Sequence, residues 1–114
     1  MSMERTEYLM MGIDIIDQVK NMTEDEIEIL QEEVNNSENL DIIYDWVSEE
    51  FCYVGITLRI SSEHIYGDSK TTELDCIDLV HLREIVDIEL EETVKDKIDW
   101  LCSDIKLIAF HRYL

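Results

Sequence analysis

The stretch from Asn21 to Leu58 carries eleven carboxylates and contains no Lys, Arg or His. Ordinary surfaces intersperse Lys with Glu and gain a few tenths of a kcal/mol from each i, i+4 pair. This block forgoes every such pair and accepts like-charge repulsion of similar size. A chain that carries this cost is expected to meet a cationic partner. High salt is the other explanation, but sixteen Ile and a full-sized core are not the usual halophile composition.

Length and composition predict one acidic globular domain spanning residues 1–114. A hydrophobic fraction of 46% is enough for a buried core and argues against disorder, despite a net charge of −19. No apolar run approaches the roughly 18 residues that cross a bilayer, and the first residues lack the layout of a signal peptide. We therefore expect a cytoplasmic protein, located in the host cytoplasm if a phage encodes it.

The chain offers little for catalysis or metal binding. The three cysteines form an odd set without a Cys-x-x-Cys pair, which favours buried thiols over disulfides or zinc. The three His are scattered, and the three Gly do not form a phosphate-binding loop. We expect no enzymatic activity, no catalytic residues, no metal and no cofactor.

Apolar periodicity predicts three helices in the first half of the chain. Within residues 4–20, apolar side chains recur at spacings of three and four, which predicts a helix. Thr23 with Glu26 forms a capping box ahead of a second helical stripe that ends near Val34. A third helix is expected from about residue 38 or 40 to residue 50, with the core stripe Leu40, Ile43, Tyr44, Val47 and Phe51.

The second half mixes strand and helix patterns. Residues 51–60 alternate as a strand, and the tail, residues 105–113, is its expected partner, although a helix is also compatible there. Thr72 with Asp75 resembles a capping box, followed by helical spacing to Cys102 as one bent helix or two. The predicted fold class is a helix-rich α+β domain with four to five helices and a small two- to three-stranded antiparallel sheet.

The expected partner site is a set of acidic rows on helices. Glu38, Asp41, Asp45 and Glu49 fall opposite the third helix's core stripe, and rows of similar pitch occur at 25–32 and 92–99. Neighbours lie about 5–6 Å apart, close to the spacing of phosphates along a nucleic-acid strand. Ile42 and Trp46 flank the row as apolar anchors. The predicted partner-binding residues are Asp25, Glu28, Glu32, Glu38, Asp41, Ile42, Asp45, Trp46 and Glu49.

The charge constrains the partner. Such a surface repels nucleic acid and anionic membranes and attracts basic proteins, so direct binding to either is not expected. In composition the chain is similar to small acidic phage decoys, such as anti-restriction proteins, anti-CRISPR proteins and inhibitors of uracil-DNA glycosylase. This resemblance implies a DNA-mimic inhibitor that occupies the basic cleft of a host defence or DNA-processing enzyme. An immunity protein or antitoxin against a basic nuclease toxin, and a non-mimic adaptor for a basic protein, remain alternatives.

Overall fold

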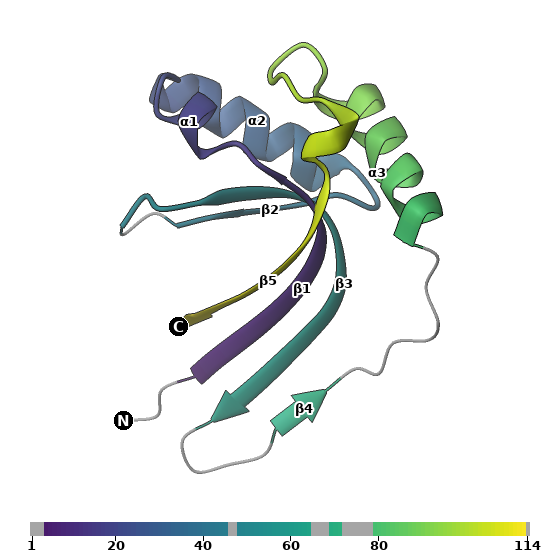
Figure 1. Ribbon diagram of the computed structural model, residues 1–114. Coiled ribbons are helices and arrows are strands. Elements are labelled where there is room, and N and C mark those ends of the chain that lie inside the picture. The colour runs from purple at the N-terminus through teal and green to yellow at the C-terminus, as the bar shows by residue number, and fades with distance from the viewer. Residues whose placement is uncertain (1–3, 46–47, 65–68, 72–78, 114) are drawn as a thin grey trace.

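The computed structural model describes residues 4–45, 48–64, 69–71 and 79–113 (Figure 1). These residues form a five-stranded antiparallel sheet, three α-helices and one short 3-10 helix. The strands are β1 (Glu4–Asp14), β2 (Asp41–Tyr44), β3 (Cys52–His64), β4 (Ser69–Thr71) and β5 (Lys106–Tyr113). The helices are α1 (Ile16–Val19), α2 (Glu24–Asn36), α3 (Leu79–Val94) and the 3-10 helix η1 (Cys102–Asp104).

Strand β1 lies in the interior of the sheet, whose strand order is β2-β3-β1-β5. It pairs with β3 along its whole length, with one register shift between Leu9 and Met10, and with β5 on its other side. The short strand β4 pairs with the far end of β3. The first strand of the chain therefore provides the pairing edge for both β3 and β5.

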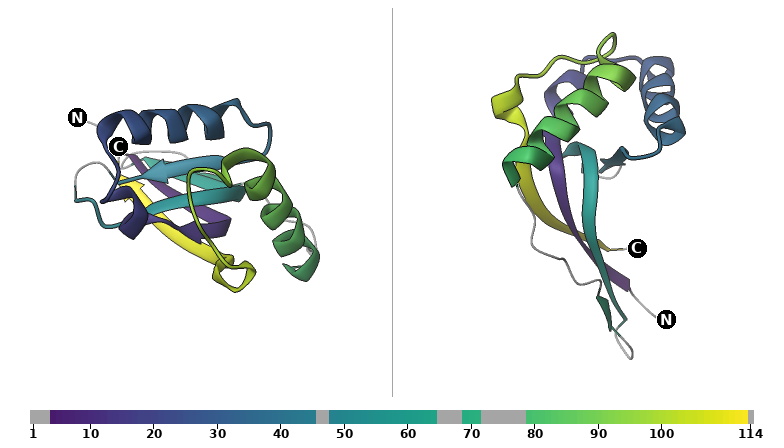
Figure 2. Two further views of the ribbon diagram at one scale, coloured as in Figure 1. Left: turned by 90° about the horizontal axis from the view of Figure 1, so that it is seen from above. Right: turned by 90° about the vertical axis from the view of Figure 1, so that its right-hand side faces the viewer.

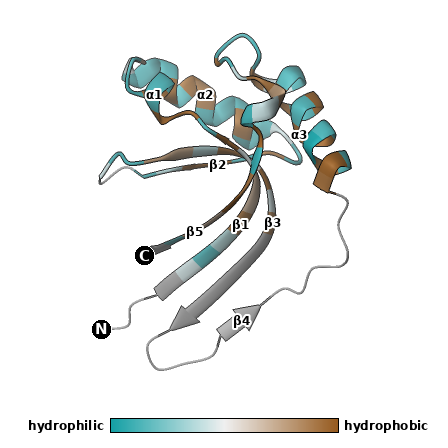
Figure 3. Ribbon diagram, viewed as in Figure 1, coloured by the Kyte–Doolittle hydropathy of each residue, from teal (hydrophilic) through white to brown (hydrophobic). Residues whose placement is uncertain are grey.

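The helices cover one face of the sheet, and the main core lies between them (Figures 1 and 2). Because side chains alternate along a strand, Met11 and Ile13 of β1 and Val54 of β3 point to this face. Helix α2 contributes Leu30 and Val34, and hydrophobic residues recur among hydrophilic ones along both α2 and α3 (Figure 3). Helix α3 adds Val86, Leu90 and Val94.

The opposite face is concave, because the long strands curve strongly (Figure 1). Gly12 of β1 and Gly55 of β3 are paired in register on this face. A Cβ on Gly12 would lie 2.3 Å from the Val54 carbonyl oxygen, and one on Gly55 would lie 2.1 Å from the Met11 carbonyl oxygen. The strands approach each other so closely that no side chain fits at either position.

The predicted fold class is wrong. The described residues contain three α-helices rather than four to five, and a five-stranded sheet rather than one of two to three strands. Two of the segments expected to be helical are largely strands, at residues 4–14 and 41–44. The sheet, not a helical bundle, therefore organises this molecule.

The predicted helix over residues 4–20 is replaced by β1 and the single turn α1. The misleading feature is continuous burial from Met10 to Ile13. Met11 and Ile13 face the helices, while Met10 faces the concave side, where it is also fully buried. A strand covered on both faces loses the alternating pattern that identifies a half-buried strand.

The predicted helix over residues 38–50 is replaced by β2 and the hairpin that leads to β3. Here too both faces are covered, since Ile43 and Tyr44 are neighbours in sequence and both are buried. The hairpin closes through a hydrogen bond from the Asp45 amide to the Phe51 carbonyl oxygen, 3.1 Å long. Glu49 adopts a left-handed φ of 54°, which a helix interior does not allow.

Other predictions are confirmed. The Thr23–Glu26 capping box is present, and α2 follows it. The strand over residues 51–60 corresponds to β3, and the tail is also a strand. The predicted pairing of these two strands is wrong, because the tail pairs with β1.

The predicted capping box of Thr72 and Asp75 lies outside the described residues. None of the helices in the described part of the chain is long and apolar enough to cross a membrane.

We expect Gly12→Ala and Gly55→Ala each to lower the free energy of unfolding by about 2 to 4 kcal/mol, because the new methyl group must force the paired backbones apart. Urea denaturation followed by circular dichroism measures this change. Lys106→Ala is the control, because Lys106 is exposed and pairs with Gly12 from β5. Its expected effect is within about 0.5 kcal/mol. Glycine variants as stable as this control would contradict the close approach.

Candidate functional site

Helix α2 presents an anionic face to solvent. Its first turn contains Glu24, Asp25 and Glu26, whose charges suit the positive end of the helix dipole. Asp25, Glu28 and Glu32 are exposed, and none of them forms an ion pair with the described residues. The three predicted partner-binding residues on this helix are thus brought together as one row.

One α2 carboxylate is paired with a cation. The Glu33 Oε1 atom lies 3.9 Å from Lys97 Nζ, in the turn that follows α3. This contact joins the side of α2 to the turn after α3, whereas Asp25, Glu28 and Glu32 make no ion pair with the described residues. The anionic row is therefore held on a rigid element but is not neutralised by it.

The other four predicted acidic residues do not form a helical row. Glu38 lies in the loop after α2, and Asp41 opens β2. Asp41 points to the concave face, because its neighbour Ile42 packs against the helix-side core. Asp45 is part of the hairpin turn, where its Oδ1 accepts a hydrogen bond from the Ser48 amide at 3.2 Å. Glu49 lies in the same turn.

The predicted apolar anchor Ile42 lies on β2 and faces the helix-side core. Ile42 is half-buried and packs against the core under α2. Trp46 lies outside the described residues. Trp100, the other tryptophan, is half-buried and donates an indole hydrogen bond of 2.8 Å from Nε1 to Asp87 Oδ1. Within the described chain, Ile42 therefore acts as a core residue.

A cleft of 230 Å³ lies beside the acidic row, between α2 and the turn after α3. Met22 and Ile29 supply its apolar surface, and Ile29 is 49% exposed. Glu26, Asp96 and Lys97 line its charged side. Asp96 belongs to the predicted row at 92–99, so the structure brings part of that row next to α2. The cleft offers the apolar contact that the sequence assigned to Ile42 and Trp46.

The concave face carries four aromatic rings in mutual contact. Tyr8 stacks on Phe110 with centroids 5.0 Å apart, and Phe51 stacks on Tyr53 at 4.7 Å. Phe110 joins the two pairs, at 4.7 Å from Tyr53 and 5.5 Å from Phe51. All four side chains are half-buried. We call Tyr8, Phe51, Tyr53 and Phe110 the ring cluster.

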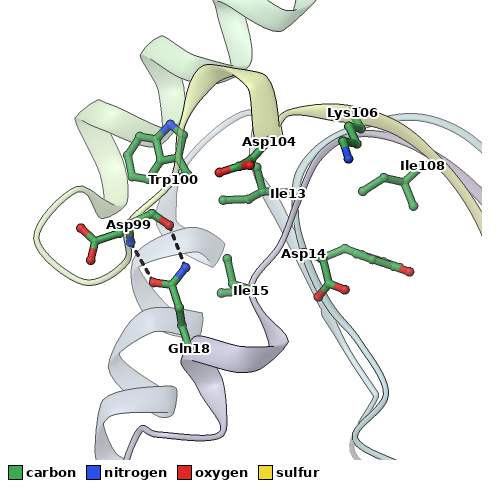
Figure 4. A pocket seen from close by; sticks show the side chains of 10 residues that line it. Ile13, Asp14, Ile15, Gln18, Asp99, Trp100, Asp104, Lys106 and Ile108 are labelled. Atoms are coloured by element: carbon green, nitrogen blue, oxygen red, sulfur yellow. Dashed lines mark hydrogen bonds between the residues drawn. The ribbon is translucent and has the colours of Figure 1, made fainter.

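A pocket of 320 Å³ adjoins the ring cluster, because Tyr53 belongs to both. Its apolar lining comes from Ile13, Ile15 and Ile108. Figure 4 shows Asp14 and Lys106 on one side of the pocket, with Trp100 and Asp104 facing them. The remaining lining residues are Gln18, Tyr53 and Asp99.

Two sets of hydrogen bonds fix the pocket wall. The Gln18 side chain donates from Nε2 to the Asp99 carbonyl oxygen at 2.7 Å and accepts from the Asp99 amide at 2.8 Å (Figure 4). The Asp14 Oδ1 atom accepts from the amides of Ile16 and Cys52 at 3.1 and 3.2 Å. These bonds connect α1, β3 and the loop before η1, so the pocket is built from segments far apart in the chain.

This pocket was not predicted from the sequence. Its residues come from positions 13–18, 53 and 99–108, and the first of these segments was expected to be helical. The available signal was the alternation of the tail, which places Lys106, Ile108 and Phe110 on one face of a strand. That signal becomes informative only once β1 is recognised as the strand that pairs with the tail.

The cysteines differ in their surroundings. Cys52 is buried in the helix-side core, and burial, followed by the charge of Asp14, raises the pKa of its thiol to about 12. Cys102 is exposed, so the prediction of buried thiols is wrong for it. Cys76 lies outside the described residues. No three His, Cys, Asp or Glu side chains are grouped to hold a metal ion in the part of the chain that the structure describes.

The path β1-α-β2-β3-α3-β5, with both main helices on one face, follows the β-α-β-β-α-β plan of the ferredoxin-like class. Many unrelated functions use this plan, so the function has to be argued from the sites. Comparison of the chain with protein-family models, curated proteins and solved structures finds no significant match.

We expect the free energy of unfolding to fall as pH rises from about 9 towards 12. In that window the folded state keeps the Cys52 proton that the unfolded state loses, so deprotonation favours unfolding. Burial also raises the pKa of Tyr44 and Tyr53, which adds to the fall above pH 10. Urea denaturation at several pH values measures the slope. Cys52→Ala should make the slope shallower, and an unchanged slope would contradict the raised thiol pKa.

Proposed function

We propose that this protein is an acidic inhibitor that binds the basic nucleic-acid-binding cleft of a host defence or DNA-processing enzyme. The observation that carries the proposal is the row of Asp25, Glu28 and Glu32, exposed on a rigid helix and without ion pairs among the described residues. Phage origin and an anti-CRISPR or anti-restriction target are the specific forms of this proposal.

Charge would control the encounter with such a partner. A net charge of −19 produces a field that accelerates association with a basic protein and that salt weakens. The adjacent cleft, with Met22 and Ile29 at its surface, supplies apolar area that becomes buried only on contact. Steering by the row and burial in the cleft together support fast and specific binding.

The length of the row limits how much nucleic acid it can imitate. Asp25 and Glu32 are seven residues apart, which is about 10 Å along the helix axis. That distance corresponds to roughly three phosphates of one strand. The shortness of the row favours, as a second candidate, an adaptor that binds a basic protein without imitating nucleic acid.

A pull-down from a bacterial lysate at low salt distinguishes these functions. Bound protein is eluted once with excess duplex DNA and once with high salt. Release of a basic nuclease or DNA-binding protein by DNA supports the inhibitor. A specific partner released by salt but not by DNA supports the adaptor, and elution of abundant basic proteins alone contradicts both.

We expect the variant Asp25→Asn/Glu28→Lys/Glu32→Lys to retain its stability within about 0.5 kcal/mol, because lost repulsion offsets altered dipole contacts. Its association rate with the captured partner should fall about tenfold or more at low salt and depend less on salt. Stopped-flow or surface-based kinetics measure both quantities.

The matched control is Asp17→Asn/Glu84→Lys/Glu91→Lys, which makes the same charge change at exposed positions outside α2. An equal loss of association rate in the control would assign the effect to net charge. Unchanged kinetics in the α2 variant would place the partner site on another surface.

A further inference from the structure

We propose that the 320 Å³ pocket is a second binding site, which receives the guanidinium group of an arginine side chain from a protein segment lying along the concave face. This site is independent of the α2 row, because its lining comes from other elements. It would remain even if the inhibitor function were wrong.

The pocket has the form that a long, cationic side chain requires. Ile13 and Ile15 are buried, and with Ile108 they give an apolar surface for the carbon stem. Tyr53 and Trp100 contribute aromatic rings, which attract cations and can stack on a planar guanidinium.

Carboxylate oxygens remain available in the pocket. Asp14 uses Oδ1 for backbone amides, and Asp104 uses Oδ2 to accept from the Leu101 amide at 2.8 Å. The second oxygen of each receives no hydrogen bond from the described residues. The Asp99 carboxylate also receives none from them, but Figure 4 shows it pointing away from the other lining side chains. These oxygens are acceptors without donors, and a guanidinium group is a planar source of five donors.

The charge balance favours a cation over an anion. Three carboxylates line the pocket, against the single amine of Lys106, which makes no ion pair with the described residues. The Lys106 amine is therefore too far from each of the three carboxylates to form a direct ion pair with it. An added cation gains attraction from the carboxylates and meets repulsion only from Lys106.

The ring cluster indicates that the cation belongs to a protein segment. Tyr53 lies in both the pocket wall and the ring cluster, so the two form one continuous surface. Half-buried aromatic rings next to charged groups are typical of protein interfaces. A small free cation would fill the pocket but leave Tyr8, Phe51 and Phe110 uncovered.

The wall is already organised for binding. The paired hydrogen bonds between Gln18 and Asp99, and the bond from Trp100 to Asp87, hold the loop before η1 in place. A ligand therefore does not have to order this loop, which reduces the entropic cost of binding.

The test titrates the full-length protein with the blocked tripeptide leucine-arginine-leucine. The readout is the indole N–H signal of Trp100 in two-dimensional NMR, assigned with Trp100→Phe. We expect saturable shifts of this signal. The same tripeptide with citrulline, which keeps the shape but not the charge, should bind roughly tenfold more weakly. Equal binding of both peptides, or no shift of Trp100, would overturn the proposal.

Variants test the charge assignment. Asp99→Asn/Asp104→Asn should weaken the arginine peptide roughly tenfold, while Lys106→Gln should strengthen it, because the repelling amine is removed. The control Asp17→Asn/Asp25→Asn makes the same charge change away from the pocket and should alter binding less than twofold. An equal loss of peptide affinity in both double variants would show that net charge alone causes the effect, and would overturn the proposed site.

Two further arms separate this site from the alternatives. Methylguanidinium that binds as tightly as the tripeptide would identify a small free cation as the occupant and overturn the protein segment. The variant Asp25→Asn/Glu28→Lys/Glu32→Lys should bind the tripeptide with less than a twofold change, whatever its effect on the lysate partner. A loss of tripeptide binding in that variant would overturn the independence of the two sites.

Discussion

The structure depends on β1 being covered on both faces. Met11 and Ile13 anchor the helices, Met10 and Tyr8 face the concave side, and β3 and β5 take up hydrogen bonds along both edges. At Gly12 the strand has no side chain, so β3 approaches until its own glycine, Gly55, is in contact. The eleven residues of β1 therefore position the helix-side core, the ring cluster and one wall of the pocket.

This arrangement explains which parts of the fold could be predicted from the sequence. Helix α2 carries its own start signal in Thr23 and Glu26. Along β3, residues of the two faces alternate in the sequence, so local information was sufficient to predict both elements. Strands β1 and β2 place apolar residues on two faces, and adjacent pairs such as Met10 and Met11 then imitate a helix. Only long-range pairing decides between these alternatives, and that information is absent from local spacing.

The fold also separates charge along the chain. Helix α2 contains no Lys or Arg, whereas Arg5, Lys70 and Arg112 lie in the end of the sheet formed by the start of β1, the end of β3, β4 and the end of β5. Lys97 approaches α2 but pairs with Glu33, so Asp25, Glu28 and Glu32 make no ion pair with the described residues. The predicted extension of the acidic row over residues 38–49 was lost for a geometric reason, because a strand and a turn do not repeat at the pitch of a helix.

The two proposed sites would use electrostatics in different ways. The α2 row is exposed to solvent and salt, so its contribution to binding would be mainly to the association rate. In the pocket, Asp14, Asp99 and Asp104 are also exposed, but the lining adds the half-buried rings of Tyr53 and Trp100 and the buried Ile13 and Ile15. A side chain that entered the pocket would therefore bury apolar and aromatic surface besides pairing with carboxylates, which would lengthen its residence time. Net charge, the most prominent feature of the sequence, is therefore sufficient to argue for the α2 row but not for the pocket.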